Sequence, residues 1–60
     1  MEAEEIKAIR QALGLTLQDF ADKIGVRIVT VQRWEADQAS PSRLVLPKLK
    51  RLQKKARSEQ

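Results

Sequence analysis

The 60-residue sequence contains no cysteine and no histidine, and its aromatic side chains are one tryptophan and one phenylalanine. Without cysteine there is neither a disulfide framework nor a thiolate metal site. Without histidine the chain lacks the usual metal ligand and the usual general base at neutral pH. No nucleophile–base pair can be assembled from the remaining residues, so we expect no catalytic residues, no metal and no cofactor. The chain is not expected to be an enzyme.

Long apolar runs are also missing. No segment approaches the roughly 18 apolar residues that cross a bilayer, and the acidic stretch Met1–Glu5 does not have the pattern of a signal peptide. A chain this short buries only about 60% of the surface that its unfolded form exposes, which excludes a large enzyme with a deep pocket. We therefore expect one small domain over residues 1–57, a frayed tail at 58–60, and a soluble, cytoplasmic binding module with no membrane partner.

Charge is distributed unevenly along the chain. Residues 1–22 carry two basic and five acidic side chains, a net charge of −3, whereas residues 23–60 carry ten basic and three acidic side chains, a net charge of +7. A basic half on a small domain suggests a polyanionic partner, most simply nucleic acid. A lysine-rich tail that only keeps the protein soluble would give the same pattern, so charge alone leaves both interpretations open.

Apolar residues at helical spacing predict three short helices in the first part of the chain. The first covers residues 3–13 and ends before Gly14, which can adopt the left-handed cap conformation. The second begins after the N-cap residue Thr16 and ends at Gly25. The third covers residues 28–36. Its β-branched start would suit a strand in isolation, but a single strand would have no partner in this chain.

The start of the last helix depends on Pro47. A turn over residues 37–40 separates this helix from the third one. In one interpretation the helix covers residues 42–57 with Pro47 inside it, where proline removes a backbone hydrogen bond. In the other, the helix begins at Leu46, Pro47 lies in its first turn, and residues 42–45 form a separate turn. The sequence does not decide between them.

Short helices with tight links predict an all-α fold, a small orthogonal bundle of four or five helices. The core is expected to form from the apolar residues on the inward stripes of these helices and from the links between them. These residues are Ile6, Ile9, Leu13, Leu15, Phe20, Ala21, Ile24, Val26, Val31, Trp34, Leu44, Val45, Leu49 and Leu52.

Two short helices joined by a three-residue turn at Gly25 have the geometry of a helix-turn-helix. Specific residues extend this match, namely Thr16-Leu17-Gln18-Asp19-Phe20-Ala21, Ile24-Gly25-Val26, Thr30-Val31, Trp34-Glu35 and Pro41. In these positions the chain resembles the Cro and lambda-repressor type (XRE family) of helix-turn-helix domains. The resemblance implies a lambda-repressor-like DNA-binding fold whose third helix, about residues 28–36, enters the major groove.

The resemblance also implies which residues would meet DNA. Base contacts map to the third helix and the residue before it, at Arg27, Ile28, Val29, Gln32 and Arg33. Phosphate contacts map to Thr16, Gln18, Thr30, Ser40, Ser42 and Arg43. In this family an arginine of the first helix often pairs with the glutamate after the tryptophan. The resemblance therefore implies a partly buried, structural salt bridge between Arg10 and Glu35.

Three positions depart from the family pattern. Leu17 stands where a phosphate-binding glutamine is usual, Arg27 where a serine or threonine caps the third helix, and Asp37 where a turn glycine is usual. Asp tolerates the left-handed conformation better than most residues. Leu17, Ile28 and Val29 would together form an apolar patch on the side meant for DNA, and such patches often mark a protein partner.

Our main hypothesis is sequence-specific binding of double-stranded DNA by a small transcriptional regulator, as a homodimer on a near-palindromic site in the bacterial or phage nucleoid. The alternative is a protein-interaction domain on the same fold that uses the Leu17, Ile28 and Val29 patch. A DNA-binding antitoxin, which differs only in having a protein partner, is a third possibility.

Overall fold

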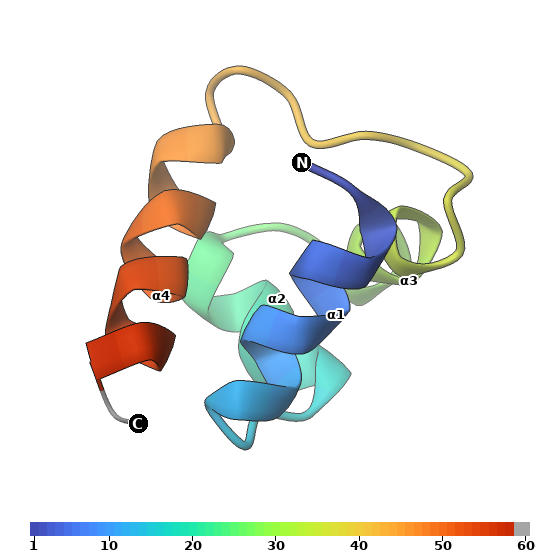
Figure 1. Ribbon diagram of the computed structural model, residues 1–60. Coiled ribbons are helices and arrows are strands. Elements are labelled where there is room, and N and C mark those ends of the chain that lie inside the picture. The colour runs from blue at the N-terminus through green and yellow to red at the C-terminus, as the bar shows by residue number, and fades with distance from the viewer. Residues whose placement is uncertain (59–60) are drawn as a thin grey trace.

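The computed structural model describes residues 1–58 as four α-helices with no strand among them (Figure 1). The helices are α1 (Ala3–Ala12), α2 (Leu17–Ile24), α3 (Ile28–Glu35) and α4 (Leu46–Ser58). The all-α prediction is confirmed, and each predicted helix is present with its ends within a few residues. Helix α4 includes Ser58, the first residue of the predicted tail, whereas residues 59–60 lie outside the described part. No helix in residues 1–58 is long and apolar enough to cross a membrane.

Helices α1, α2 and α3 end in the same way. One residue adopts the left-handed conformation, and the amide of the next residue donates to the carbonyl five residues before it. The left-handed residues are Gly14 (φ 67°), Gly25 (φ 86°) and Asp37 (φ 61°). The donating and accepting residues are Leu15 and Arg10, Val26 and Ala21, and Gln38 and Arg33, at 2.8–3.1 Å. The chain therefore reverses sharply after each helix, and the tolerance of Asp37 for a glycine position is confirmed.

The starts of α2 and α3 differ. Thr16 is the N-cap of α2, because its hydroxyl oxygen accepts a hydrogen bond from the Asp19 amide at 3.1 Å, as predicted. Arg27 occupies the same position before α3 and makes no side-chain capping bond. The missing cap inferred from the sequence is thus a feature of the structure. Helix α3 consequently depends on packing rather than on local hydrogen bonds to stay in place.

Helix α4 begins at Leu46, which decides the question raised by Pro47. Residues 43–45 form a separate turn, and the Val45 and Leu46 amides donate to the Ser42 carbonyl at 3.0 and 3.1 Å. Pro47 therefore lies in the first turn, where a backbone N–H would have no partner within the helix. The interpretation with Pro47 inside a helix over residues 42–57 is wrong. The connection from α3 to α4 arches over one end of the bundle (Figure 1).

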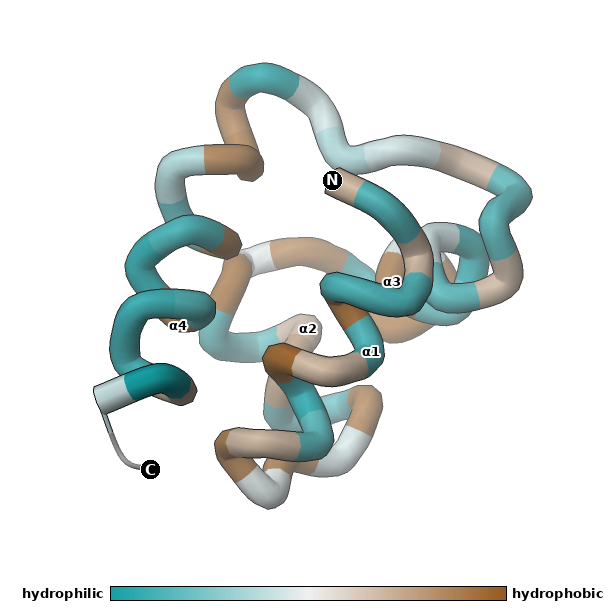
Figure 2. Tube along the Cα trace, in the orientation of Figure 1, coloured by the Kyte–Doolittle hydropathy of each residue, from teal (hydrophilic) through white to brown (hydrophobic). Residues whose placement is uncertain are grey.

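The core lies between the inward faces of the four helices. In Figure 2 hydrophobic stretches of the trace lie in the middle of the molecule and also just before α4, whereas the outer turns of α4 are hydrophilic. The buried cluster consists of Ile6, Ile9, Phe20, Ala21, Ile24, Val31, Trp34 and Leu49. All eight belong to the predicted core. The predicted core residues Leu13, Leu15, Val26, Val45 and Leu52 are only partly buried and pack against its edge.

The assignment of Leu44 to the core is wrong, because its side chain is 88% exposed. The reason is the turn at residues 43–45, which ends before the helix starts and leaves Leu44 on the outside. Leu46, the first residue of α4, packs against the core instead. Near the end of α4, Ala56 is also buried, at 6% exposure, although it was not among the expected core residues.

Leucines 49 and 44 provide a matched test of this core. Leu49→Ala should lower the free energy of unfolding by about 2–5 kcal/mol, because it opens a cavity beneath α4. Leu44→Ala removes the same atoms from an exposed position and should change stability by less than about 0.5 kcal/mol. Urea unfolding followed by circular dichroism measures both variants. Equal losses would contradict the assignment of Leu49 to the core and Leu44 to the surface.

Candidate nucleic-acid interface

Helix α3 has one buried face and one exposed face. Val31 and Trp34 are 0% and 3% exposed and seat the helix on the core. Val29, Gln32 and Arg33 are exposed and occur at spacings of three and four residues, so they share the opposite face. Because the buried pair fixes the rotation of the helix, these three side chains point away from the domain together.

The remaining two predicted base contacts are placed differently from each other. Arg27 is exposed at the N-cap of α3, before the first helical turn. Ile28 is partly buried and packs against the core, so most of its side chain is committed to the interior. The structure therefore brings Val29, Gln32 and Arg33 to one accessible face of α3 and leaves Arg27 exposed at the start of the helix.

A surface hollow of about 330 Å³ lies between α3 and the segment that follows it. Thr30 and Arg33 line it from α3, and Ser40 and Ser42 line it from the connection to α4. Three residues predicted to contact phosphates thus share one hollow with a residue predicted to contact bases. The rest of its lining is apolar, from Val26, Trp34, Ala39 and Val45. Its hydroxyl and guanidinium groups are donors of the kind that phosphate oxygens accept from. Arg43 follows Ser42 in the sequence and is exposed.

Two further predicted phosphate contacts lie near the start of α2, and both already make internal hydrogen bonds. The Thr16 hydroxyl oxygen accepts the Asp19 amide, which leaves its own O–H able to donate to another group. Gln18 Nε2 donates to Asp22 Oδ1 at 2.9 Å, and one of its two amide hydrogens remains for a second acceptor. Both side chains are exposed, so each retains one donor toward solvent.

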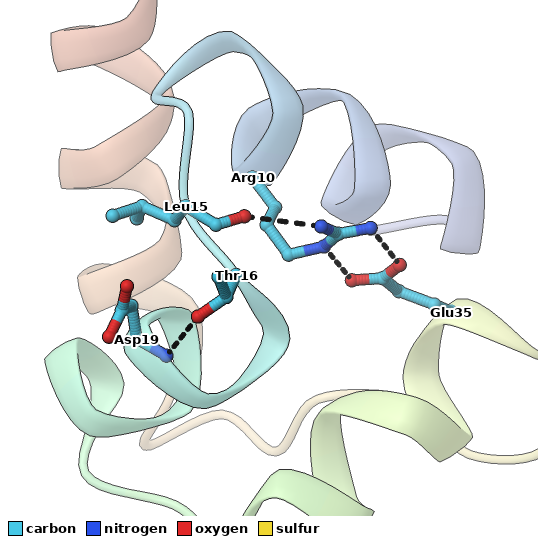
Figure 3. A network of polar contacts seen from close by, with 5 residues as sticks. All are labelled: Arg10, Leu15, Thr16, Asp19 and Glu35. Carbon is cyan, nitrogen blue, oxygen red and sulfur yellow. Dashed lines mark hydrogen bonds and ion pairs between the residues drawn. The ribbon is translucent and has the colours of Figure 1, made fainter.

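The ion pair expected between Arg10 and Glu35 is present and joins α1 to α3 (Figure 3). Arg10 Nε donates to Glu35 Oε2 at 2.8 Å and Nη2 donates to Oε1 at 3.1 Å. Nη1 donates to the Leu15 carbonyl at 3.2 Å, so the same guanidinium also holds the link between α1 and α2. The hydrogen bond to Glu35 raises the pKa of Arg10 further above its already high value. The guanidinium is therefore a permanent structural cation near the end of α3.

A family model described as helix-turn-helix matches residues 6–54, which include all of α2 and α3 and the turn between them. This chain belongs to the XRE-type helix-turn-helix family. The resemblance noted in the sequence is thereby confirmed for the family and for the fold.

Curated relatives of this helix-turn-helix domain are proteins named "Uncharacterized HTH-type transcriptional regulator YiaG" from Escherichia coli strains K12, O6:H1 and O157:H7. Each is 42% identical over 48 residues, which cover 80% of this chain and 49% of the relative. The chain thus spans about half the length of the curated relatives it matches. No solved structure matches it significantly.

The apolar patch expected on this helix-turn-helix domain is not assembled as predicted. Leu17 and Ile28 are partly buried and pack against the core, and Val29, which is 43% exposed, is the one member open to solvent. Packing of the two helices against the core explains the difference, because it turns Leu17 and Ile28 inward.

Among residues 1–58, no group of three acidic side chains could hold a metal ion.

One contact at the helix-turn-helix was not anticipated from the sequence. Lys48 Nζ, from the first turn of α4, donates to the carbonyl of Ile24, the last residue of α2, at 3.1 Å. The two residues are far apart in the sequence, and no motif links them. The only available signal was a lysine early in a helix of uncertain start, which could equally have pointed to solvent.

A double-mutant cycle tests the Arg10–Glu35 pair. Arg10→Met should lower the free energy of unfolding by about 1.5–3 kcal/mol, because it removes charge-assisted hydrogen bonds and leaves the Glu35 carboxylate unpaired. Glu35→Gln should cost a similar amount, and the double variant less than the sum of the two. Urea unfolding measures all three. Additive losses would show that the two side chains do not stabilise the domain through each other.

Proposed function

We propose that this domain binds double-stranded DNA in a sequence-specific manner as part of a transcriptional regulator, with α3 in the major groove. The observation that carries the proposal is the outward face of α3. Val29, Gln32 and Arg33 project from a helix whose opposite face is held by Val31 and Trp34. A major groove about 12 Å wide admits one such helix. The names of the curated relatives, which are transcriptional regulators, agree with this function.

Each exposed side chain of α3 would contact a different kind of base. Arg27 and Arg33 can each pair bidentately with guanine, and Gln32 can pair with adenine. Val29 has no hydrogen-bonding group and would contact a thymine methyl, and Ile28 would do so only with the part of its side chain that the core leaves free. These contacts would supply most of the discrimination between sequences.

Phosphate contacts would come from two groups of residues outside the base-reading face of α3. One group would be Thr16 and Gln18 at the start of α2. The other would be Thr30, Ser40, Ser42 and Arg43, the first three of which line the hollow of about 330 Å³ beside α3. The net charge of +7 on residues 23–60 would strengthen attraction to the backbone at low salt. Such contacts would set the register of the domain on the duplex.

A symmetric homodimer on a near-palindromic site would place one α3 in each of two successive major grooves, about 34 Å apart. A protein-interaction function through Leu17, Ile28 and Val29 has less support, because two of these three side chains pack against the core.

Selection of bound sequences from a pool of random duplexes tests the proposed function directly. We expect a consensus whose two halves are related by symmetry, followed by tight binding of that duplex in an anisotropy titration. The affinity should fall steeply with salt, since each neutralised phosphate contributes about 0.9 to the slope of log affinity against log salt. Failure to enrich any sequence, together with weak binding that is insensitive to salt, would exclude the proposal.

Two single substitutions separate base reading from phosphate contact. Gln32→Ala should relax selectivity at one base pair by about 1–3 kcal/mol and leave the salt slope unchanged. Arg43→Gln should weaken binding to all duplexes alike and reduce the slope by about 0.9. Anisotropy titrations with matched and mismatched duplexes measure both effects. The reverse pattern would exchange the proposed roles of these two residues.

A further inference from the structure

Lys48 satisfies a backbone group that α2 cannot satisfy by itself. Its Nζ donates to the Ile24 carbonyl at 3.1 Å, and Ile24 is the last residue of α2. The last carbonyls of an α-helix have no hydrogen-bond partner within the helix. A cation is also favoured at this end of a helix, because the backbone dipole is negative there.

The contact lies at the turn that joins α2 to α3. Gly25 follows Ile24 in the left-handed conformation, and Lys48 Nζ lies 3.7 Å from the position that a Cβ on Gly25 would occupy. Only residues 25–27 separate the two helices. The direction in which α3 leaves the turn therefore depends on the orientation of the backbone that Lys48 contacts.

The backbone at Lys48 is held in place by the packing of the first turn of α4. Its neighbour Leu49 is 0% exposed, and Val45 and Leu46 pack against the core. The Lys48 amide itself donates to the Val45 carbonyl at 3.0 Å. Because the helix start is anchored, less conformational freedom is lost when Nζ reaches Ile24 than for a lysine on a loose segment.

We propose that Lys48 is a positioning residue for α3. Its ammonium ties α4 to the end of α2 and holds the turn from which α3 projects, and it does so in place of contacting a phosphate. The effect on DNA binding rests on the proposed function, whereas the tether itself does not. Lys50 supplies a matched control, since it lies two residues further along α4, is exposed as Lys48 is, and makes no hydrogen bond to α2.

Amide hydrogen exchange tests the tether without DNA. The Gly25 and Val26 amides both donate to the Ala21 carbonyl at the turn. In Lys48→Met these two amides should exchange about three- to tenfold faster, the range expected for loss of one hydrogen bond. The Leu15 amide at the end of α1 serves as an internal reference and should be unaffected.

Two control variants show whether the change in exchange comes from the cationic donor at position 48. Lys48→Arg, which keeps a cationic donor, should retain most of the protection, and Lys50→Met should leave it unchanged. No change in Lys48→Met, or an equal change in Lys50→Met, would overturn the tether. A change that includes the Leu15 amide equally would show general destabilisation and would overturn it as well.

Binding titrations then test positioning. With the duplex recovered by selection and a scrambled duplex of the same length, Lys48→Met should lose about three- to tenfold more affinity for the selected one. Its salt slope should equal that of the unchanged domain. Equal losses on both duplexes with a slope reduced by about 0.9 would instead identify Lys48 as a phosphate contact and overturn the proposal.

The two experiments can fail separately. If the unchanged domain binds neither duplex, the proposed function fails, but the exchange rates at Gly25 and Val26 still decide whether Lys48 holds the turn. A second outcome is that the unchanged domain binds the selected duplex while Lys48→Met keeps the same ratio of affinities for the selected and scrambled duplexes. In that case the positioning role fails and the proposed function stands.

Discussion

The packing of Val31 and Trp34 against the core is the interaction on which the rest of this structure depends. Helix α3 has no side-chain cap at Arg27 and only eight residues, so it has little stability of its own. Burial of two large side chains on one face both holds the helix and fixes its rotation. The outward direction of Gln32 and Arg33 is a consequence of that burial.

Two polar contacts support α3, one at its last residue and one just before the turn that leads into it. The Arg10 guanidinium reaches Glu35 at the last residue of α3, and Lys48 reaches Ile24 before the turn. Both donors come from helices outside the helix-turn-helix pair, and both join residues more than twenty positions apart. In a chain this small the core alone leaves a narrow margin of stability, so contacts that connect distant segments have a large relative effect.

The helix ends could be predicted because their determinants are local. Gly14, Gly25 and Asp37 each take the left-handed conformation where the sequence placed a turn, and Thr16 caps α2 as expected. The Arg10–Glu35 pair was inferred from family resemblance, since nothing in the residues between them brings two positions 25 apart together. The sequence leaves the start of α4 open, because a proline in a first turn and one inside a helix differ only through their surroundings.

The sequence by itself determined the first three helical segments and their ends, all eight residues of the buried cluster and the membership of the helix-turn-helix family, because these follow from short-range patterns of apolar and turn residues. Tertiary structure alone decided that Leu44 faces solvent, that Leu17 and Ile28 turn inward, and that Lys48 meets Ile24. These outcomes depend on how separate helices lie against one another. Exposure and contact between helices are properties of the packed arrangement, whereas periodicity describes one helix at a time.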